Sequence, residues 1–201
     1  LAAAGAFGAE RALLDFGPVA LAADPARFAH AFARRALAPD DPGGAVLAAA
    51  LAERRARSPE ILDACHFALE RLLRAADRAG LRLAAQLGVT PWQSPSPREL
   101  GALRATFGPA LGVVWDPARL SVLATLGLPA ADDRLRALAA GAVAVLDNDA
   151  VGLGCGYLPG LGERDPRLAA FEVPPAAARI VTGPSDATDA EVAAATATQT
   201  G

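Results

Sequence analysis

Short apolar runs alternate with longer amphipathic segments along the chain. This rhythm predicts an α/β fold in which a parallel sheet is covered by helices. In such a sheet, ligands bind at the carboxyl ends of the strands, where the following loops converge. We predict five strands from the apolar runs: Arg11–Phe16, Leu81–Gln86, Leu111–Trp115, Ala142–Leu146 and Arg179–Thr182.

The segment Pro59–Ala79 is the clearest predicted helix, and Gly80 follows it as a C-terminal stop. Its apolar residues recur at helical spacing: Leu62, Leu69, Leu72, Leu73 and Ala76. Between the first two strands, Ala36–Arg57 contains a turn at Pro39–Gly44 and then an Ala-rich helix. We interpret this segment as an elaborated connection.

Other helix starts are marked by a capping residue followed by proline at the first helical position. This pair occurs repeatedly along the chain: Asp24-Pro25, Ser58-Pro59, Ser96-Pro97, Asp116-Pro117 and Asp165-Pro166. Two further pairs have the spacing of a capping box, in which each residue bonds to the backbone of the other. They are Ser96 with Glu99, and Thr188 with Glu191.

The composition suits a globular protein with one core. The chain has 201 residues, of which 53% are hydrophobic, whereas a complete eight-unit barrel needs about 250 residues. All 19 basic residues are arginine, so a Schiff-base lysine and a phosphate-loop lysine are both excluded. The net charge of -3 and the lack of a basic tract argue against a nucleic-acid partner.

Cys65 and Cys155 are too few for a disulfide framework or a thiolate metal site, so we expect both to be free thiols. Cys155 is a weak candidate for a nucleophile, because no histidine is predicted near it to lower its pKa. No stretch of about 18 uncharged apolar residues predicts a membrane span. We therefore expect a cytoplasmic protein without a membrane partner.

Four segments together resemble the xylose-isomerase-like TIM-barrel superfamily, the sugar phosphate isomerase/epimerase group. They are ACHFALERLLRAADRAGLRLAAQ, SPSPRELGALRATFGPALGVVWDPARL, AVAVLDNDAVG and PGLGERDPRLAA, in the order that the family has them. The resemblance implies that residues 1–201 form a single TIM-barrel-like domain containing the third to seventh β/α units. Such an incomplete barrel leaves sheet edges open, so we expect a longer natural chain or a homo-oligomer.

Members of this family hold a divalent metal with Glu, Asp, His and Glu side chains at strand ends. At the corresponding positions this sequence has Gln86, Asp116, Leu146 and Gly183, so only the aspartate is retained. Arg119 replaces a histidine that often follows the aspartate by three positions. The resemblance therefore implies that the metal site is mostly lost, and we expect no cofactor.

The function implied is that of a divergent sugar isomerase/epimerase-like protein. We expect catalytic roles for Asp116 and Asp149, and contacts to a sugar or polyol from Gln86, Trp92, Arg119 and Asp147. One alternative is a non-catalytic protein that binds a sugar or polyol or forms a subunit interface. Another keeps metal-free acid/base chemistry on Asp116, Asp147 and Asp149, for which one carboxylate needs a raised pKa.

Several candidates also have structural interpretations. Asp116 precedes Pro117 and is expected to cap a helix. The run Asp147–Asp149 is either a ligand site, together with Glu163, or a polar turn. Arg119 and Arg164 either grip an anion or form salt bridges. Trp115 and His66 are expected to pack structurally, and the glycine-rich segment Gly152–Gly156 predicts a flexible loop.

Overall fold

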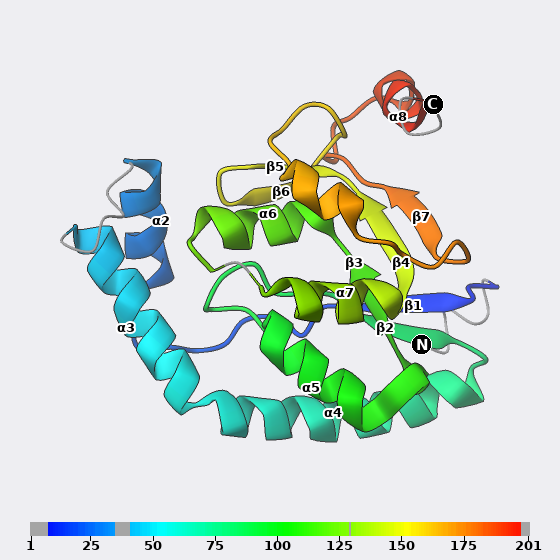
Figure 1. Cartoon of the computed structure of the whole chain (residues 1–201), viewed down its shortest axis with the longest axis horizontal. Coiled ribbons are helices and arrows are strands. Elements are labelled where there is room, and N and C mark those ends of the chain that lie inside the picture. The colour runs from blue at the N-terminus through cyan, green and yellow to red at the C-terminus, as the bar shows by residue number, and fades with distance from the viewer. Residues whose placement is uncertain (1–7, 35–40, 129, 198–201) are drawn as a thin grey trace.

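The structure is a computed structural model that describes residues 8–34, 41–128 and 130–197. Its centre is a curled five-stranded sheet in which all neighbouring strands are parallel (Figure 1). The strands follow one another across the sheet in chain order: β1 (Arg11–Leu14), β2 (Arg82–Ala85), β3 (Leu111–Trp115), β4 (Ala142–Asp147) and β7 (Ala178–Val181). All five predicted strands are confirmed to within two residues at each end.

The main core lies between this sheet and the helices that connect its strands. These are α4 (Ser58–Arg78), α5 (Pro97–Phe107), α6 (Pro117–Thr125) and α7 (Asp132–Ala140). Side chains alternate along a strand, so Leu83, Val113 and Trp115 face these helices. Ala84 and Val114 face the other side, where they form a small cluster with Leu146.

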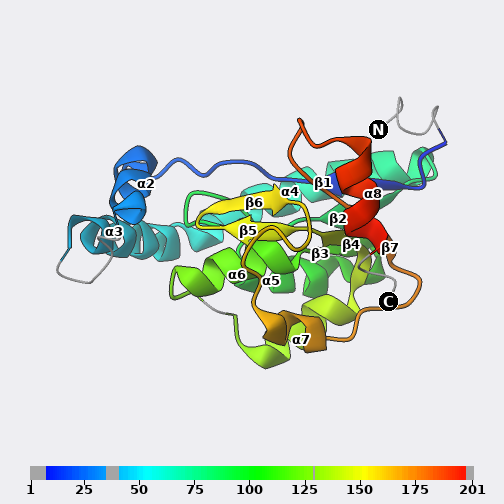
Figure 2. The same ribbon diagram turned by 90° about the horizontal axis from the view of Figure 1, so that it is seen from above.

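The predicted helix Pro59–Ala79 is confirmed as α4, which buries Ile61, Cys65, Leu69 and Ala76. The capping box at the start of α5 is also confirmed, with both of its hydrogen bonds present. The second capping box joins Thr188 and Glu191 at the start of α8 (Asp189–Ala197), which packs against β7 (Figure 2). The caps predicted at Asp24, Asp116 and Asp165 are also confirmed. The cap predicted at Ser58 is wrong, because α4 already includes Ser58 and its N-cap position is held by Arg57 without a side-chain hydrogen bond.

The connection between β1 and β2 is longer than the others because it carries two extra helices beside the sheet (Figure 1). They are α2 (Pro25–Ala33) and α3 (Pro42–Ala56). The turn predicted at Pro39–Gly44 is partly wrong: Gly43 and Gly44 lie inside α3, because Pro42 starts the helix, and Pro39 and Asp40 lie outside the described residues. These two helices pack with α6 and with Trp92 in a second apolar cluster.

The glycine-rich segment after β4 is not the flexible loop that its composition predicts. It forms an antiparallel hairpin of β5 (Asp149–Val151) and β6 (Gly154–Tyr157), which packs on α6. Gly152 has a φ of 60° at the turn, a conformation that glycine adopts without strain. No helix in the described part of the chain is both long enough and apolar enough to span a membrane.

Candidate ligand-binding site

Polar side chains directly follow each of the first four strands. Asp15 follows β1, Gln86 follows β2, Asp116 follows β3 and Asn148 follows β4. Because these strands are parallel and adjacent, their carboxyl ends meet at one edge of the sheet. Gln86 and Asn148 donate to Asp116, and Arg119, from the first turn of α6, bonds to both Asp116 and Asp15, so the five residues form one hydrogen-bonded group. We call these five residues the strand-end cluster.

Asp116 is the centre of the strand-end cluster. It caps α6 by accepting a hydrogen bond from the Arg119 backbone N–H at 3.2 Å, which confirms the capping interpretation. Its Oδ2 also accepts from Gln86 Nε2 at 3.0 Å, and its Oδ1 accepts from Asn148 Nδ2 over a long 3.5 Å. The side chain is buried, with 1% of the residue exposed.

Burial of the carboxylate raises the pKa of Asp116 above its ordinary value. Loss of hydration disfavours the charged form, and this effect outweighs the hydrogen bonds from Arg119 and Gln86, which favour it. The fold therefore favours the protonated, neutral form of the Asp116 carboxyl.

Arg119 holds the cluster to the surrounding backbone. Its Nη2 donates to Asp15 Oδ2 at 3.2 Å, and its Nη1 donates to the Leu87 carbonyl. Its Nε lies 3.5 Å from Asp116 Oδ2. Asp15 is about half exposed whereas Asp116 is buried, so the arginine joins an outer acid to an inner one. The salt-bridge interpretation of Arg119 is confirmed, and Arg164 likewise lies 3.8 Å from a carboxylate, that of Asp149.

Asn148 is the least satisfied member of the cluster. Only 2% of the residue is exposed, and its Oδ1 has no hydrogen-bond partner among the described residues. Buried polar atoms in folded proteins are almost always paired, so an unpaired amide oxygen indicates a place for a donor from outside the protein. The neighbouring Nδ2 already points to Asp116.

The structure does not bring Trp92 into this cluster. Only 6% of the residue is exposed, its ring lies 5.2 Å from that of Phe28, and its Nε1 donates to the Ala23 carbonyl at 2.7 Å. A ring packed in this way presents no free face for a sugar to stack on. Trp115 is also buried, against Phe171, as the sequence predicts.

Asp147 and Asp149 lie beside the cluster but have other partners. Asp147 forms a two-pronged ion pair with Arg179 of β7, at 3.0 and 3.1 Å. Asp149 accepts backbone N–H bonds from Gly160 and Gly162, at 2.6 and 3.2 Å, and so holds the loop that follows β6. These contacts favour the structural interpretation of both acids, although each remains near the strand ends.

Neither cysteine is an activated nucleophile. Both thiols are free, as expected, and Cys65 is buried within α4. Burial and, to a smaller extent, the nearby Asp116 carboxylate raise the pKa of Cys155 to about 12, against a smaller opposing effect of Arg119. His66 packs against the Phe107 ring on the helix surface, with ring centroids 4.7 Å apart, which confirms its structural role.

The residues at the strand ends do not fit the divalent metal that members of the resembled family hold. The Asp116 oxygens already accept bonds from amide and guanidinium donors, and a guanidinium 3.5 Å away would repel a cation. Leu146 packs in the apolar cluster on the inner face of the sheet, and Gly183 has no side chain to offer. No group of three potential metal ligands occurs within the described ranges.

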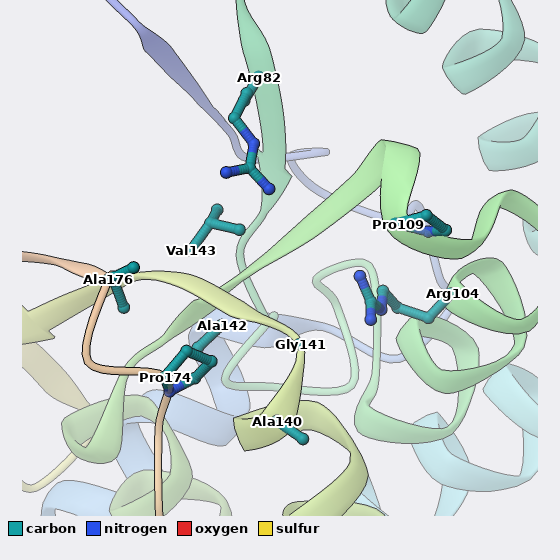
Figure 3. A pocket seen from close by; sticks show the side chains of 10 residues that line it. Arg82, Arg104, Pro109, Ala140, Gly141, Ala142, Val143, Pro174 and Ala176 are labelled. Carbon is teal, nitrogen blue, oxygen red and sulfur yellow. The ribbon is translucent and has the colours of Figure 1, made fainter.

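A separate cavity of about 240 Å³ lies at the amino ends of the strands, between Arg82 and Arg104 (Figure 3). Arg104 donates to the Leu111 carbonyl, and its guanidinium covers Gly141 so closely that a Cβ there would lie 2.6 Å from Nη2. Gly141 ends α7, where a positive charge is favourable. We assign Arg104 a structural role at this helix end.

Asp15 is absent from the predicted site because the predicted first strand continues to Phe16 and includes the acid. The strand ends at Leu14, so Asp15 is the first residue beyond it. The sequence identifies Asn148 only as part of the run Asp147–Asp149, which is interpreted either as a ligand site together with Glu163 or as a polar turn. In both cases the position directly after a strand is the signal that identifies the residue.

Comparison with known proteins finds no relative. No family model matches the chain, and neither a curated protein nor a solved structure matches it. The site must therefore be interpreted from its own geometry.

Proposed function

We propose that this chain is a divergent sugar isomerase/epimerase-like protein with a partial TIM-barrel-like fold, and that its strand-end cluster binds a sugar or polyol without a metal. The observation that carries the proposal is the row of polar residues directly after four neighbouring strands, with one buried acceptor, Asn148 Oδ1, unused. The carboxyl edge of a parallel sheet is where such folds bind ligands.

The chemistry of the cluster suits a ligand with several hydroxyl groups. A hydroxyl both donates and accepts hydrogen bonds. Asp15 and Asn148 Oδ1 supply acceptors, whereas Arg119 supplies donors. One arginine lies between two acids, so the set carries at most one net negative charge. A neutral polyhydroxylated molecule matches this set better than an anion does.

The test is isothermal titration calorimetry with pentoses, hexoses and their alditols. We expect saturable binding of at least one compound, weakened about tenfold in Asp15→Asn, because the ligand loses a charged acceptor. The matched control is Asp63→Asn, an exposed aspartate on the surface of α4, which should bind as the parent protein does. The proposal fails if no compound binds, or if both variants bind equally well.

A second candidate function is metal-free proton transfer by Asp116. The raised pKa of this acid favours it, since a general acid or base works best when its pKa lies near the working pH. Incubating sugars with the protein in D₂O, with a chelator present, would reveal exchange or epimerisation by NMR. We expect Asp116→Asn to abolish any such activity while Asp149→Asn retains it, because Asp149 holds a loop. Sugar binding without deuterium exchange would favour a protein that binds sugars but does not catalyse a reaction on them.

A further inference from the structure

A second cavity, of about 400 Å³, lies apart from the strand-end cluster. Its walls come from α3, from the loop and helix start after β2, and from the connection between α6 and α7, which face one another in Figure 1. Four arginines line it, and no acidic side chain does so among the residues described: Arg54, Arg55, Arg98 and Arg134. We call it the arginine pocket.

Arg54 supplies the strongest indication of a ligand. Only 7% of the residue is exposed, although it carries a charge. Its Nη2 donates to Glu99 Oε2 at 2.5 Å and to the Gln93 carbonyl at 3.3 Å. Its Nη1 is buried and finds no acceptor in the described chain. Leaving a charged donor unpaired is costly, so an acceptor from a bound molecule is expected at this position.

The charge of the arginine pocket favours an anion. Glu99 neutralises Arg54, which leaves Arg55, Arg98 and Arg134 as exposed guanidinium groups. None of these three forms an ion pair with another described residue.

We propose that the arginine pocket binds the phosphoryl group of a phosphorylated small molecule. A guanidinium presents its N–H donors in a fork that matches phosphate oxygens. A phosphate monoester carries close to two negative charges at neutral pH, which suits three unpaired arginines. The cavity is large enough to hold the organic part of such a ligand as well. This site is independent of the sugar-binding proposal.

The experiment is a ³¹P NMR titration of the protein into inorganic phosphate and into methyl phosphate, at constant ionic strength. We expect saturable broadening of both signals, with binding weakened about tenfold in Arg98→Gln and in Arg134→Gln. Both residues are exposed, so these variants should fold normally. The matched control is Arg71→Gln, an exposed arginine on α4 away from the pocket, which should change binding less than twofold.

Three results would overturn the inference. The first is an absence of saturable binding by either phosphate compound. The second is equal weakening by all three arginine variants, which would mean that general surface charge attracts the anion. The third is competition by succinate as strong as that by methyl phosphate, since the site would then select carboxylates. If methyl phosphate displaces bound inorganic phosphate but ribose does not, the phosphate site is distinct from the sugar site proposed at the strand-end cluster.

Discussion

Two buried carboxylates lie at the starts of helices in this protein, and they differ in how their charge is balanced. Glu99 lies in the first turn of α5 and pairs with the buried Arg54 at 2.5 Å, while also accepting from Ser58 and from the Ser96 backbone. Asp116 caps α6 and accepts mainly from amide groups, with the Arg119 guanidinium farther away at 3.5 Å.

The first group is a structural ion pair, whereas the second contains an acid whose pKa the fold has shifted. The Glu99 group joins α3 to α5 through a full opposite charge, so it stabilises the arrangement of two helices. The Asp116 group is compensated less fully, because Arg119 is shared with Asp15, and burial raises the pKa of Asp116. It also lies at the carboxyl edge of the sheet, where this type of fold binds ligands. Similar residues in similar local structure can thus serve stability in one place and chemistry in another.

The most direct test of this contrast removes the charge that balances Glu99. Arg54→Met keeps much of the side-chain volume but leaves the carboxylate buried and unpaired. We expect the free energy of unfolding to fall by about 3–5 kcal/mol, the usual cost of breaking a buried ion pair from one side. Urea denaturation followed by circular dichroism measures it.

Arg167→Met is the matched control for this change. The Arg167 ion pair with Asp165 is almost as short, at 2.6 Å, but the arginine side chain is 78% exposed. Exposed pairs contribute little to stability, because water screens their charges. A loss of stability in Arg54→Met as small as that in Arg167→Met would show that the Arg54 pair does not hold the two helices together.

The pH dependence of stability tests the Asp116 half of the comparison. A carboxyl whose pKa is raised by folding binds a proton more tightly in the native state, so its contribution to stability falls as pH rises from about 4 through the raised pKa. Asp116→Asn removes this titration. We therefore expect the stability of the parent protein, relative to the variant, to decrease over that pH interval in urea denaturation.

Asp165→Asn provides a control of opposite sign. Hydrogen bonds from Arg167 lower the pKa of Asp165 below its ordinary value. The stability that this acid contributes is present above about pH 4 and is lost as pH falls through the lowered pKa. A parent protein that gained stability relative to Asp116→Asn with rising pH would contradict the assigned shift.

The sheet and its long helices could be predicted because local and global preferences agree there. The strands β3 and β4 are continuous apolar runs, as buried parallel strands usually are. Helix α4 has a regular apolar stripe, and α5 begins with a capping box. Those signals depend only on nearby residues, so they can be read directly from the chain.

The parts that could not be predicted depend on contacts between distant residues. The β5–β6 hairpin has little apolar alternation, and it is ordered by packing on α6. Arg54 is buried together with its partner Glu99, which lies 45 residues farther along the chain. The sequence favours Trp92 as a site residue because it lies just beyond a strand end, yet Phe28 and the Ala23 carbonyl fix it in an apolar cluster.

Asn148→Ala is expected to change the stability least, in contrast to Arg54→Met. The asparagine side chain has one long hydrogen bond and one unpaired oxygen, so its removal costs few stabilising interactions. We expect a change of about 1 kcal/mol or less in the free energy of unfolding, because no partner loses a short hydrogen bond. Sugar binding should nevertheless weaken at least tenfold in calorimetry, since the ligand loses its buried acceptor. A loss of several kcal/mol of stability in this variant would show that Asn148, like Glu99, has a structural role. Unchanged sugar binding would show that Asn148 does not contact the ligand.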